Sequence, residues 1–167
     1  YKAALNYDID DDKMIYVLWS EGFRLGGFNS IKNPNSILPD QYNKDTLTNM
    51  EVGLKSQWMD NRLQLNVSLY QMAWKDIQRG ITDPDDWAAN GTINMGDAEL
   101  SGAEVSMTFL VSDNLTVDAS YAVSDSELED NYYQGDLLGQ ADPGDQLGAR
   151  GQELAIAPPS KWWIGVE

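Results

Sequence analysis

Much of the chain alternates apolar and polar residues with a period of two, the pattern of a β-strand that has one apolar face. In the clearest stretch Leu63, Leu65 and Val67 alternate with Gln64 and Asn66. An apolar run, MIYVLW, also predicts a strand. Together the pattern predicts seven strands, at 1–7, 14–28, 46–58, 62–78, a fifth whose later half is 103–111, 115–124 and 153–167.

Polar segments of two lengths connect these strands. Short turns rich in Asp and Asn fall at 9–12, 59–61 and 112–114, and long loops fall at 29–45, 79–92 and 130–152. Because turns and loops alternate strictly, an antiparallel meander places every turn at one end of the sheet and every loop at the other. This asymmetry, with strands longer than the ~9–11 residues that cross a bilayer, is typical of outer-membrane β-barrels.

The two strand faces differ in chemistry. Polar side chains predicted to share one face are Glu51, Lys55, Gln64, Asn66, Ser68, Glu104, Asp118 and Ser120. In a barrel this face looks into a wet interior while the apolar face meets lipid, whereas in a soluble sandwich it is the solvent face. Trp58 and Tyr7 each lie beside a short turn. They are consistent either with an aromatic girdle at the lipid headgroups or with ordinary packing at the edge of a soluble sheet. The facing of Trp162 and Trp163 is ambiguous from the pattern.

Composition removes several classes of function. The 167 residues include neither Cys nor His, which excludes disulfides, Cys/His zinc sites and His-dependent catalysis. A formal net charge of −16 disfavours binding to nucleic acid. The chain contains no run of ~18 apolar residues, so no membrane helix is predicted. This test does not detect the strands of a membrane β-barrel, because they alternate apolar and polar residues. Since the chain starts at Tyr1 and still has a strand pattern at its last residues, we expect a segment of a longer protein.

Four ordered pieces of the chain resemble the C-terminal β-barrel of TonB-dependent outer-membrane receptors. They are Tyr16 with SEGFRLGGFN (20–29), LTNMEVGLKS (47–56), RLQLN through WKDIQ (62–78), and Asn94 with GDA (96–98) leading to GAEV (102–105). Each piece is short, but their order and spacing cover almost the whole chain. The resemblance implies an all-β fold, in which an antiparallel meander of about seven long strands is a segment of a 22-stranded barrel.

By this resemblance, residues 1–167 form part of a receptor barrel whose remaining strands and plug domain lie outside the chain. The implied location is the outer membrane of a Gram-negative bacterium, and the implied function is import of a scarce nutrient, most often a ferric siderophore. The implied partners are outer-membrane lipid, the extracellular ligand, and TonB acting through the absent plug. Neither a cofactor nor a catalytic residue is expected.

Five residues are candidates for ligand contact. Arg24 is expected at the outer mouth, where its guanidinium would hold an anionic ligand or a loop carboxylate. Glu51 and Lys55 share the polar strand face, where we expect salt bridges. Tyr132 and Tyr133 lie in the acidic loop segment 125–145, which would suit a cationic or metal-laden ligand.

Three other interpretations stay open on sequence alone. The run Asp8 to Asp12 has a calcium-like spacing but lacks the Gly and the distal Glu of a calcium loop, so we expect a turn and no metal site. Abundant Trp, Tyr and carboxylates also fit a soluble all-β carbohydrate-binding module. A small glycosidase would require two carboxylates, such as Glu51 and Glu104, to converge in a cleft.

Overall fold

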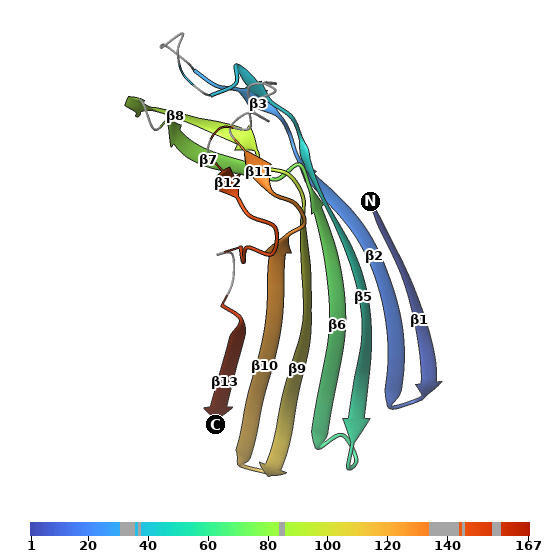
Figure 1. Cartoon of the computed structure of the whole chain (residues 1–167). Coiled ribbons are helices and arrows are strands. Elements are labelled where there is room, and N and C mark those ends of the chain that lie inside the picture. The colour runs from blue at the N-terminus through green and yellow to red at the C-terminus, as the bar shows by residue number, and fades with distance from the viewer. Residues whose placement is uncertain (31–35, 37, 84–85, 134–143, 145, 155–157) are drawn as a thin grey trace.

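The computed structural model describes all residues except 31–35, 37, 84–85, 134–143, 145 and 155–157, and consists of β-strands joined by turns and loops. Seven long strands form one antiparallel sheet in the order β1-β2-β5-β6-β9-β10-β13 (Figure 1). They are Lys2–Asp10 (β1), Lys13–Arg24 (β2), Asp45–Trp58 (β5), Leu63–Lys75 (β6), Ala98–Ser112 (β9), Leu115–Leu128 (β10) and Ser160–Val166 (β13). Within the described ranges, no helix is long and apolar enough to cross a membrane.

Three small two-stranded sheets lie beyond one end of the long strands. They pair Gly27–Phe28 (β3) with Gln41–Tyr42 (β4), Gln78–Asp83 (β7) with Asp86–Asn94 (β8), and Tyr132–Tyr133 (β11) with Gln146–Gly148 (β12). Figure 1 shows all three at the upper end, while the short turns of the long hairpins lie at the lower end. The predicted segregation of turns and loops is confirmed.

Local chemistry accounts for the short turns. Between β1 and β2 the Asp10 carboxylate accepts a hydrogen bond from the Asp12 amide at 3.0 Å and another from the Lys13 ammonium at 2.9 Å. The bond from Lys13 lowers the pKa of the Asp10 carboxyl. Between β5 and β6 the backbone takes positive φ at Met59, Asp60 and Asn61. Asp and Asn tolerate that region because their side chains bond nearby backbone.

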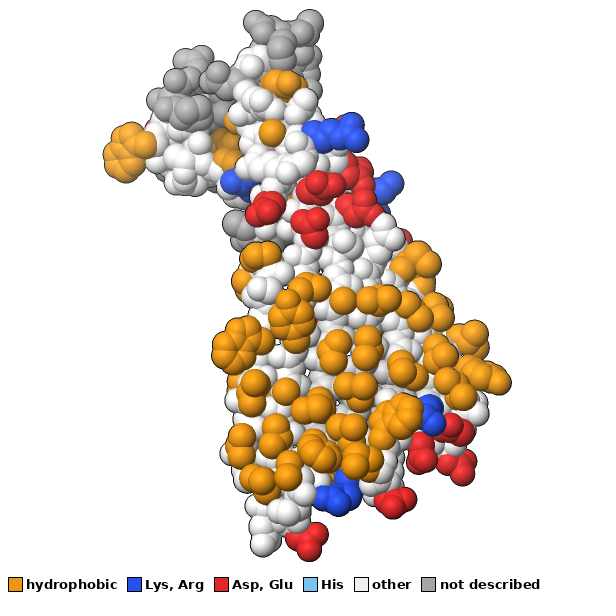
Figure 2. Space-filling model, turned by 60° about the horizontal axis from the view of Figure 1, so that its bottom comes forward, with side chains coloured by type: hydrophobic (Ala, Val, Ile, Leu, Met, Phe, Trp, Pro, Cys, Tyr) orange, Lys and Arg blue, Asp and Glu red, His pale blue; other side chains and the backbone are white. Residues whose placement is uncertain are grey.

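Strand register divides the sheet into two faces. The apolar face carries cross-strand rows such as Val17–Val52–Leu69 and Leu65–Met107–Ala119. Figure 2 shows a broad band of apolar side chains on one face of the molecule, with charged groups at both ends of the band. Leu69 is 54% exposed and Ile164 is 60% exposed, so none of the described residues forms a second layer over this face. An exposed apolar surface of this extent requires a membrane or a partner.

The polar face lies on the reverse of the sheet. One row runs Lys55–Asn66–Ser106–Ser120, and the next runs Gly53–Ser68–Glu104–Ala122–Lys161. Register also settles the two tryptophans whose facing the sequence left open. Trp162 pairs with Tyr121 on the apolar face, and Trp163 pairs with Ser120 on the polar face.

Several predicted boundaries were wrong, among them the following. The second long strand ends at Arg24, and Gly27–Phe28 belongs to a separate sheet. The strand predicted over 62–78 ends at Lys75, because Asp76 takes a positive φ of 55° and turns the chain. The loop predicted at 79–92 is the β7–β8 hairpin, and the last strand begins at Ser160 rather than at 153.

The buried core of the described residues lies at the loop end of the sheet. Its buried apolar members are Leu38, Ile77, Ile93, Met95, Ala98 and Leu128. Ala98 and Leu128 are cross-strand partners on the polar face of β9 and β10, so the loops fold onto that face. We call this cluster the mouth core.

Candidate functional site

The mouth core fixes the outer loops in place. Ile93 is 0% exposed, and Trp74, Tyr132 and Leu147 pack against the cluster from the surrounding segments. Burial of such apolar side chains contributes about 1.5–3 kcal/mol each relative to exposure. The loops above the polar face are therefore a packed structure built from four regions of the chain.

Asp45 is the centre of a polar network beneath this core. Its carboxylate accepts hydrogen bonds from Arg24 Nε at 2.9 Å, from Trp74 Nε1 at 3.0 Å and from the Gln78 amide at 3.2 Å. Arg24 Nη2 donates to the same carboxylate and to the Gln78 carbonyl, and its guanidinium lies over the Trp74 ring. Arg24 thus lies at the loop end of the sheet and holds a carboxylate of its own chain.

The environment of Asp45 determines its charge state. Asp45 is 2% exposed and is the first residue of β5. The nearest apolar residue of β5 on the apolar face is Met50, five residues further along the strand. Asp45 therefore lies outside the apolar band. Burial alone would raise the pKa of this carboxyl, but the hydrogen bonds from Arg24, Gln78 and Trp74 outweigh it and lower the pKa to about 2. The carboxylate is ionised at all physiological pH values.

Asn and Gln side chains tie the loops together around this network. Gln78 Nε2 donates to the carbonyls of Leu25 and Asn43, each at 2.9 Å. Asn94 Nδ2 donates to the Asp76 carbonyl at 2.7 Å, and Asn94 Oδ1 accepts from the Asn43 amide at 2.7 Å. Residues from three of the sequence pieces thus meet at one junction.

Asn29 makes a second tie. Its Nδ2 donates to the carbonyls of Pro39 and Thr92, and its Oδ1 accepts from the Thr92 amide at 2.8 Å. Gly91 packs beside it, because a Cβ at Gly91 would lie 3.0 Å from the Asn29 side chain and 2.9 Å from Leu38. This contact joins the 29–45 segment to β8.

The polar face carries a cluster of side chains around the Tyr16 ring. The Tyr16 ring covers Gly53 on the neighbouring strand, and its hydroxyl donates to Glu51 Oε1 at 2.5 Å. Lys55 lies over the same ring, 5.7 Å from the centroid. The salt bridges expected on this face for Glu51 and Lys55 are absent among the described residues. The physical reason is spacing: the two side chains flank Gly53 on one strand, and the Tyr16 ring occupies the space above that glycine.

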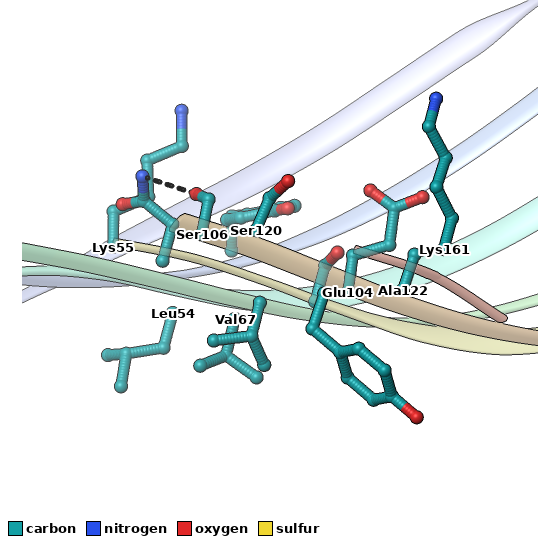
Figure 3. Close-up of a pocket in the computed structure, with 13 residues that line it drawn as sticks. Leu54, Lys55, Val67, Glu104, Ser106, Ser120, Ala122 and Lys161 are labelled. Atoms are coloured by element: carbon teal, nitrogen blue, oxygen red, sulfur yellow. Dashed lines mark hydrogen bonds between the residues drawn. The ribbon is translucent and has the colours of Figure 1, made fainter. Parts of the chain in front are cut away.

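A cavity of about 280 Å³ lies beside this cluster. Figure 3 shows Lys55, Glu104 and Lys161 rising on one side of the sheet, with Leu54 and Val67 pointing to the opposite side. Small side chains line the cavity between the charged groups, namely Ser68, Ser106, Ser120 and Ala122. Asn66 Nδ2 donates to Ser106 Oγ at 3.3 Å across its floor.

The remaining sequence candidates fall at other places. Tyr132 and Tyr133 form β11, and Tyr132 packs against the mouth core. Trp58 is paired with Leu63 beside the β5–β6 turn, where Lys13 lies 4.6 Å over its ring. In the part of the chain that the structure describes, no three acidic side chains come close enough to hold a metal ion, and this includes the run from Asp8 to Asp12.

Sequence reasoning missed Asp45, Trp74 and Lys161 as site residues. Asp45 fell at the end of a predicted loop, and nothing in the spacing connects it with Arg24, 21 residues earlier. Asn29 and Asn94 were detectable, because both belong to the sequence pieces that carry the family resemblance. Their contribution is to hold the loops, not to present a functional group to solvent.

The two-faced sheet with its outer loops defines this chain as part of a transmembrane β-barrel. Its sequence matches the family described as TonB dependent receptor-like, beta-barrel, over residues 1–162. The chain therefore belongs to the TonB-dependent receptors, which are transporters of the Gram-negative outer membrane and not enzymes. This assignment sets aside the carbohydrate-binding module and the glycosidase.

Individual relatives support the same family. The chain is 24% identical over 135 residues to a probable TonB-dependent siderophore receptor, PiuA, of Acinetobacter baumannii, covering 78% of this chain and 17% of that protein. Among solved structures it resembles the ferric yersiniabactin uptake receptor FyuA of Yersinia pestis, with a TM-score of 0.72, 17% identity, and coverage of 99% of this chain and 22% of that one.

The ferripyoverdine receptor of Pseudomonas aeruginosa is a further structural neighbour. It has a TM-score of 0.61 and 15% identity, with coverage of 99% of this chain and 19% of that chain. At these identities the likeness shows the fold. The chain spans about a fifth of the length of the relatives it matches.

Proposed function

We propose that the whole protein imports a ferric siderophore across the outer membrane and that residues 1–167 form about seven strands of its 22-stranded barrel. The remaining strands and a plug domain, through which TonB would act, lie elsewhere in the protein. The observation that carries this proposal is the sheet itself, which has an exposed apolar band on one face and polar side chains and packed loops on the other. The siderophore is supported by the printed functions of PiuA, FyuA and the ferripyoverdine receptor.

The predicted ligand-contact residues divide by depth. Tyr132 and Tyr133 lie among the outer loops, where an extracellular ligand arrives first, and Tyr133 is the better candidate because Tyr132 packs into the mouth core. Glu51 and Lys55 lie deeper, on the face that would line the passage. We assign Arg24 to holding the loops through Asp45, since its guanidinium is already engaged there.

The test is uptake by the full-length receptor in a Gram-negative host that lacks siderophore receptors of its own. Radiolabelled ferric complexes of catecholate, hydroxamate and mixed siderophores are supplied one at a time. We expect saturable uptake of one class, abolished by a protonophore. If no ferric complex enters while copper or another nutrient does, the siderophore proposal is wrong and the transporter class stands.

The same assay tests the outer-loop contact. Tyr133→Ala is expected to raise the KM for uptake severalfold without changing the amount of receptor in the membrane, and Tyr133→Phe separates loss of the ring from loss of the hydroxyl. An unchanged KM in Tyr133→Ala would remove this residue from the ligand site.

A further inference from the structure

Short turns fix the register of only some of the strand pairs. The pairs β1–β2, β5–β6 and β9–β10 are closed by short turns, and such a turn sets which residues of a hairpin lie opposite each other. The strands β2 and β5 are instead joined through residues 25–44, and β6 and β9 through residues 76–97. Connections of this length leave the register of these two strand pairs open, so side-chain contacts must specify it.

The apolar band does not distinguish the possible registers. Because side chains of a strand alternate with a period of two, a slip by two residues keeps every side chain on its own face. Such a slip between β6 and β9 would move Val67 from Val105 to Ala103 or Met107, which are also apolar. The lipid-facing side therefore stays apolar in the native register and in both slipped registers.

Two tyrosine–glycine pairs on the polar face do distinguish them. Tyr16 of β2 lies directly opposite Gly53 of β5, and Tyr70 of β6 lies directly opposite Gly102 of β9. A Cβ on either glycine would overlap the opposite tyrosine ring, so each ring occupies space that a side chain would otherwise fill. Gly53 is the single glycine of β5, and Gly102 is the single glycine of β9. Each ring therefore fits its neighbouring strand in one register only.

A slip by two residues would put a side chain where each ring now lies. In β6–β9, Tyr70 would face Leu100 or Glu104 in place of its glycine. The residues two positions before and after Gly53 carry long side chains as well. In either strand pair the ring would have to turn away from the sheet and lose its contact with the backbone of the next strand.

We propose that Tyr16–Gly53 and Tyr70–Gly102 are register locks, which fix the pairing of β2 with β5 and of β6 with β9 while the barrel assembles. Both locks lie between strands that are joined by a long connection. Within the short-turn hairpins the same two glycines face serines of β6 and β10 instead. The two tyrosines are positioning residues, and their role is independent of which nutrient the receptor imports.

Paired cysteine substitutions in the full-length receptor, on a background without other cysteines, report the register of β6–β9. Residues 1–167 contain no cysteine of their own. Residues directly opposite each other across two strands are close enough for a disulfide, whereas diagonal neighbours, about 7–8 Å apart, are not. Asn66→Cys with Ser106→Cys therefore reports the native register. Asn66→Cys with Glu104→Cys, or with Thr108→Cys, reports the two slipped registers.

Each cysteine pair is combined with changes at the Tyr70–Gly102 lock and read in receptor newly assembled in the outer membrane. With Tyr70→Ala we expect the slipped links to rise severalfold above the level without this change and the native link to fall. Tyr70→Phe keeps the ring and is expected to leave all three links unchanged. Tyr121→Ala is the matched control, because it removes a tyrosine that faces Val105 on the apolar side, and it is also expected to leave them unchanged.

Two results would overturn the proposal. One is that Tyr70→Ala forms the native link alone, with slipped links no more abundant than without the change. The other is that Tyr121→Ala or Tyr70→Phe raises the slipped links as much as Tyr70→Ala does. If Tyr70→Ala leaves too little receptor in the membrane to read, Tyr70→Leu is scored by the same criteria, because it keeps apolar bulk without a ring. Uptake is not part of this experiment, so failure of the siderophore proposal does not change its outcome.

Discussion

Substituting Asp45 by Asn is the most direct test of how the outer loops are held. The variant keeps the shape of the side chain but removes its charge. It also places an NH₂ group opposite N–H donors that bond to a carboxylate oxygen in the wild-type protein. The folded pKa of about 2 lies below the usual 3.8. At 1.36 kcal/mol per pKa unit this difference corresponds to about 2 kcal/mol of stabilisation, or a change of a few tens-fold in an opening equilibrium.

The sign of the pH dependence follows from the lowered pKa. Stabilisation by ionised Asp45 is fully present above the ordinary pKa of 3.8 and is lost as pH falls through about 2. In the wild-type protein, protection of the network is therefore expected to decline between about pH 4 and pH 2. In Asp45→Asn it is already low at neutral pH and does not follow this titration.

Hydrogen exchange of the full-length receptor measures this directly at the Gln78 amide, which donates to Asp45. At pH 7 we expect exchange to be tens of times faster in Asp45→Asn than in wild type, and unchanged in Asp40→Asn, an exposed carboxylate near the same loops. Arg24→Lys is expected to fall between them, because an ammonium cannot make the two-pronged contact. Equal protection in wild type and Asp45→Asn would refute the reasoning.

Three further substitutions probe the core, the apolar band and the strand contacts. Ile93→Ala empties a fully buried position of the mouth core and is expected to cost about 2–5 kcal/mol, seen as faster proteolysis of the outer loops. Val67→Arg places a charge in the apolar band and is expected to cost about 2–4 kcal/mol, seen as reduced assembly in the outer membrane. Gly102→Ala would bring a Cβ within 2.6 Å of the Val123 carbonyl oxygen, and we expect a loss of about 1–3 kcal/mol in thermal unfolding.

Each of these substitutions has a matched control in the same chain. Trp87 is 87% exposed on the β7–β8 hairpin, so Trp87→Ala is expected to leave proteolysis unchanged. Gln64 neighbours the apolar band but faces the other way, so Gln64→Arg should assemble normally. A Cβ at Gly22 would meet nothing within 4 Å, so Gly22→Ala should unfold at the wild-type temperature. Equal effects in a variant and its control would contradict the corresponding assignment.

The long strands and their faces were predictable because period-two alternation is a local property of the chain. The alternation of Leu63, Leu65 and Val67 with polar neighbours defines two faces before any partner strand is known. The three turns were likewise visible in local Asp and Asn clusters. The family followed from ordered short pieces, and the match over residues 1–162 confirmed it.

The mouth core and the charged sites were decided by the tertiary structure alone. Leu38, Ile77, Ile93 and Leu128 come from four segments without any shared periodicity, so only the folded chain shows that they pack together. Asp45 meets Arg24 because register aligns the ends of β2 and β5. Local sequence determines which way a side chain points, but whether a charge finds a partner depends on strands far apart in the chain, because ion pairs and packing act only at contact distance.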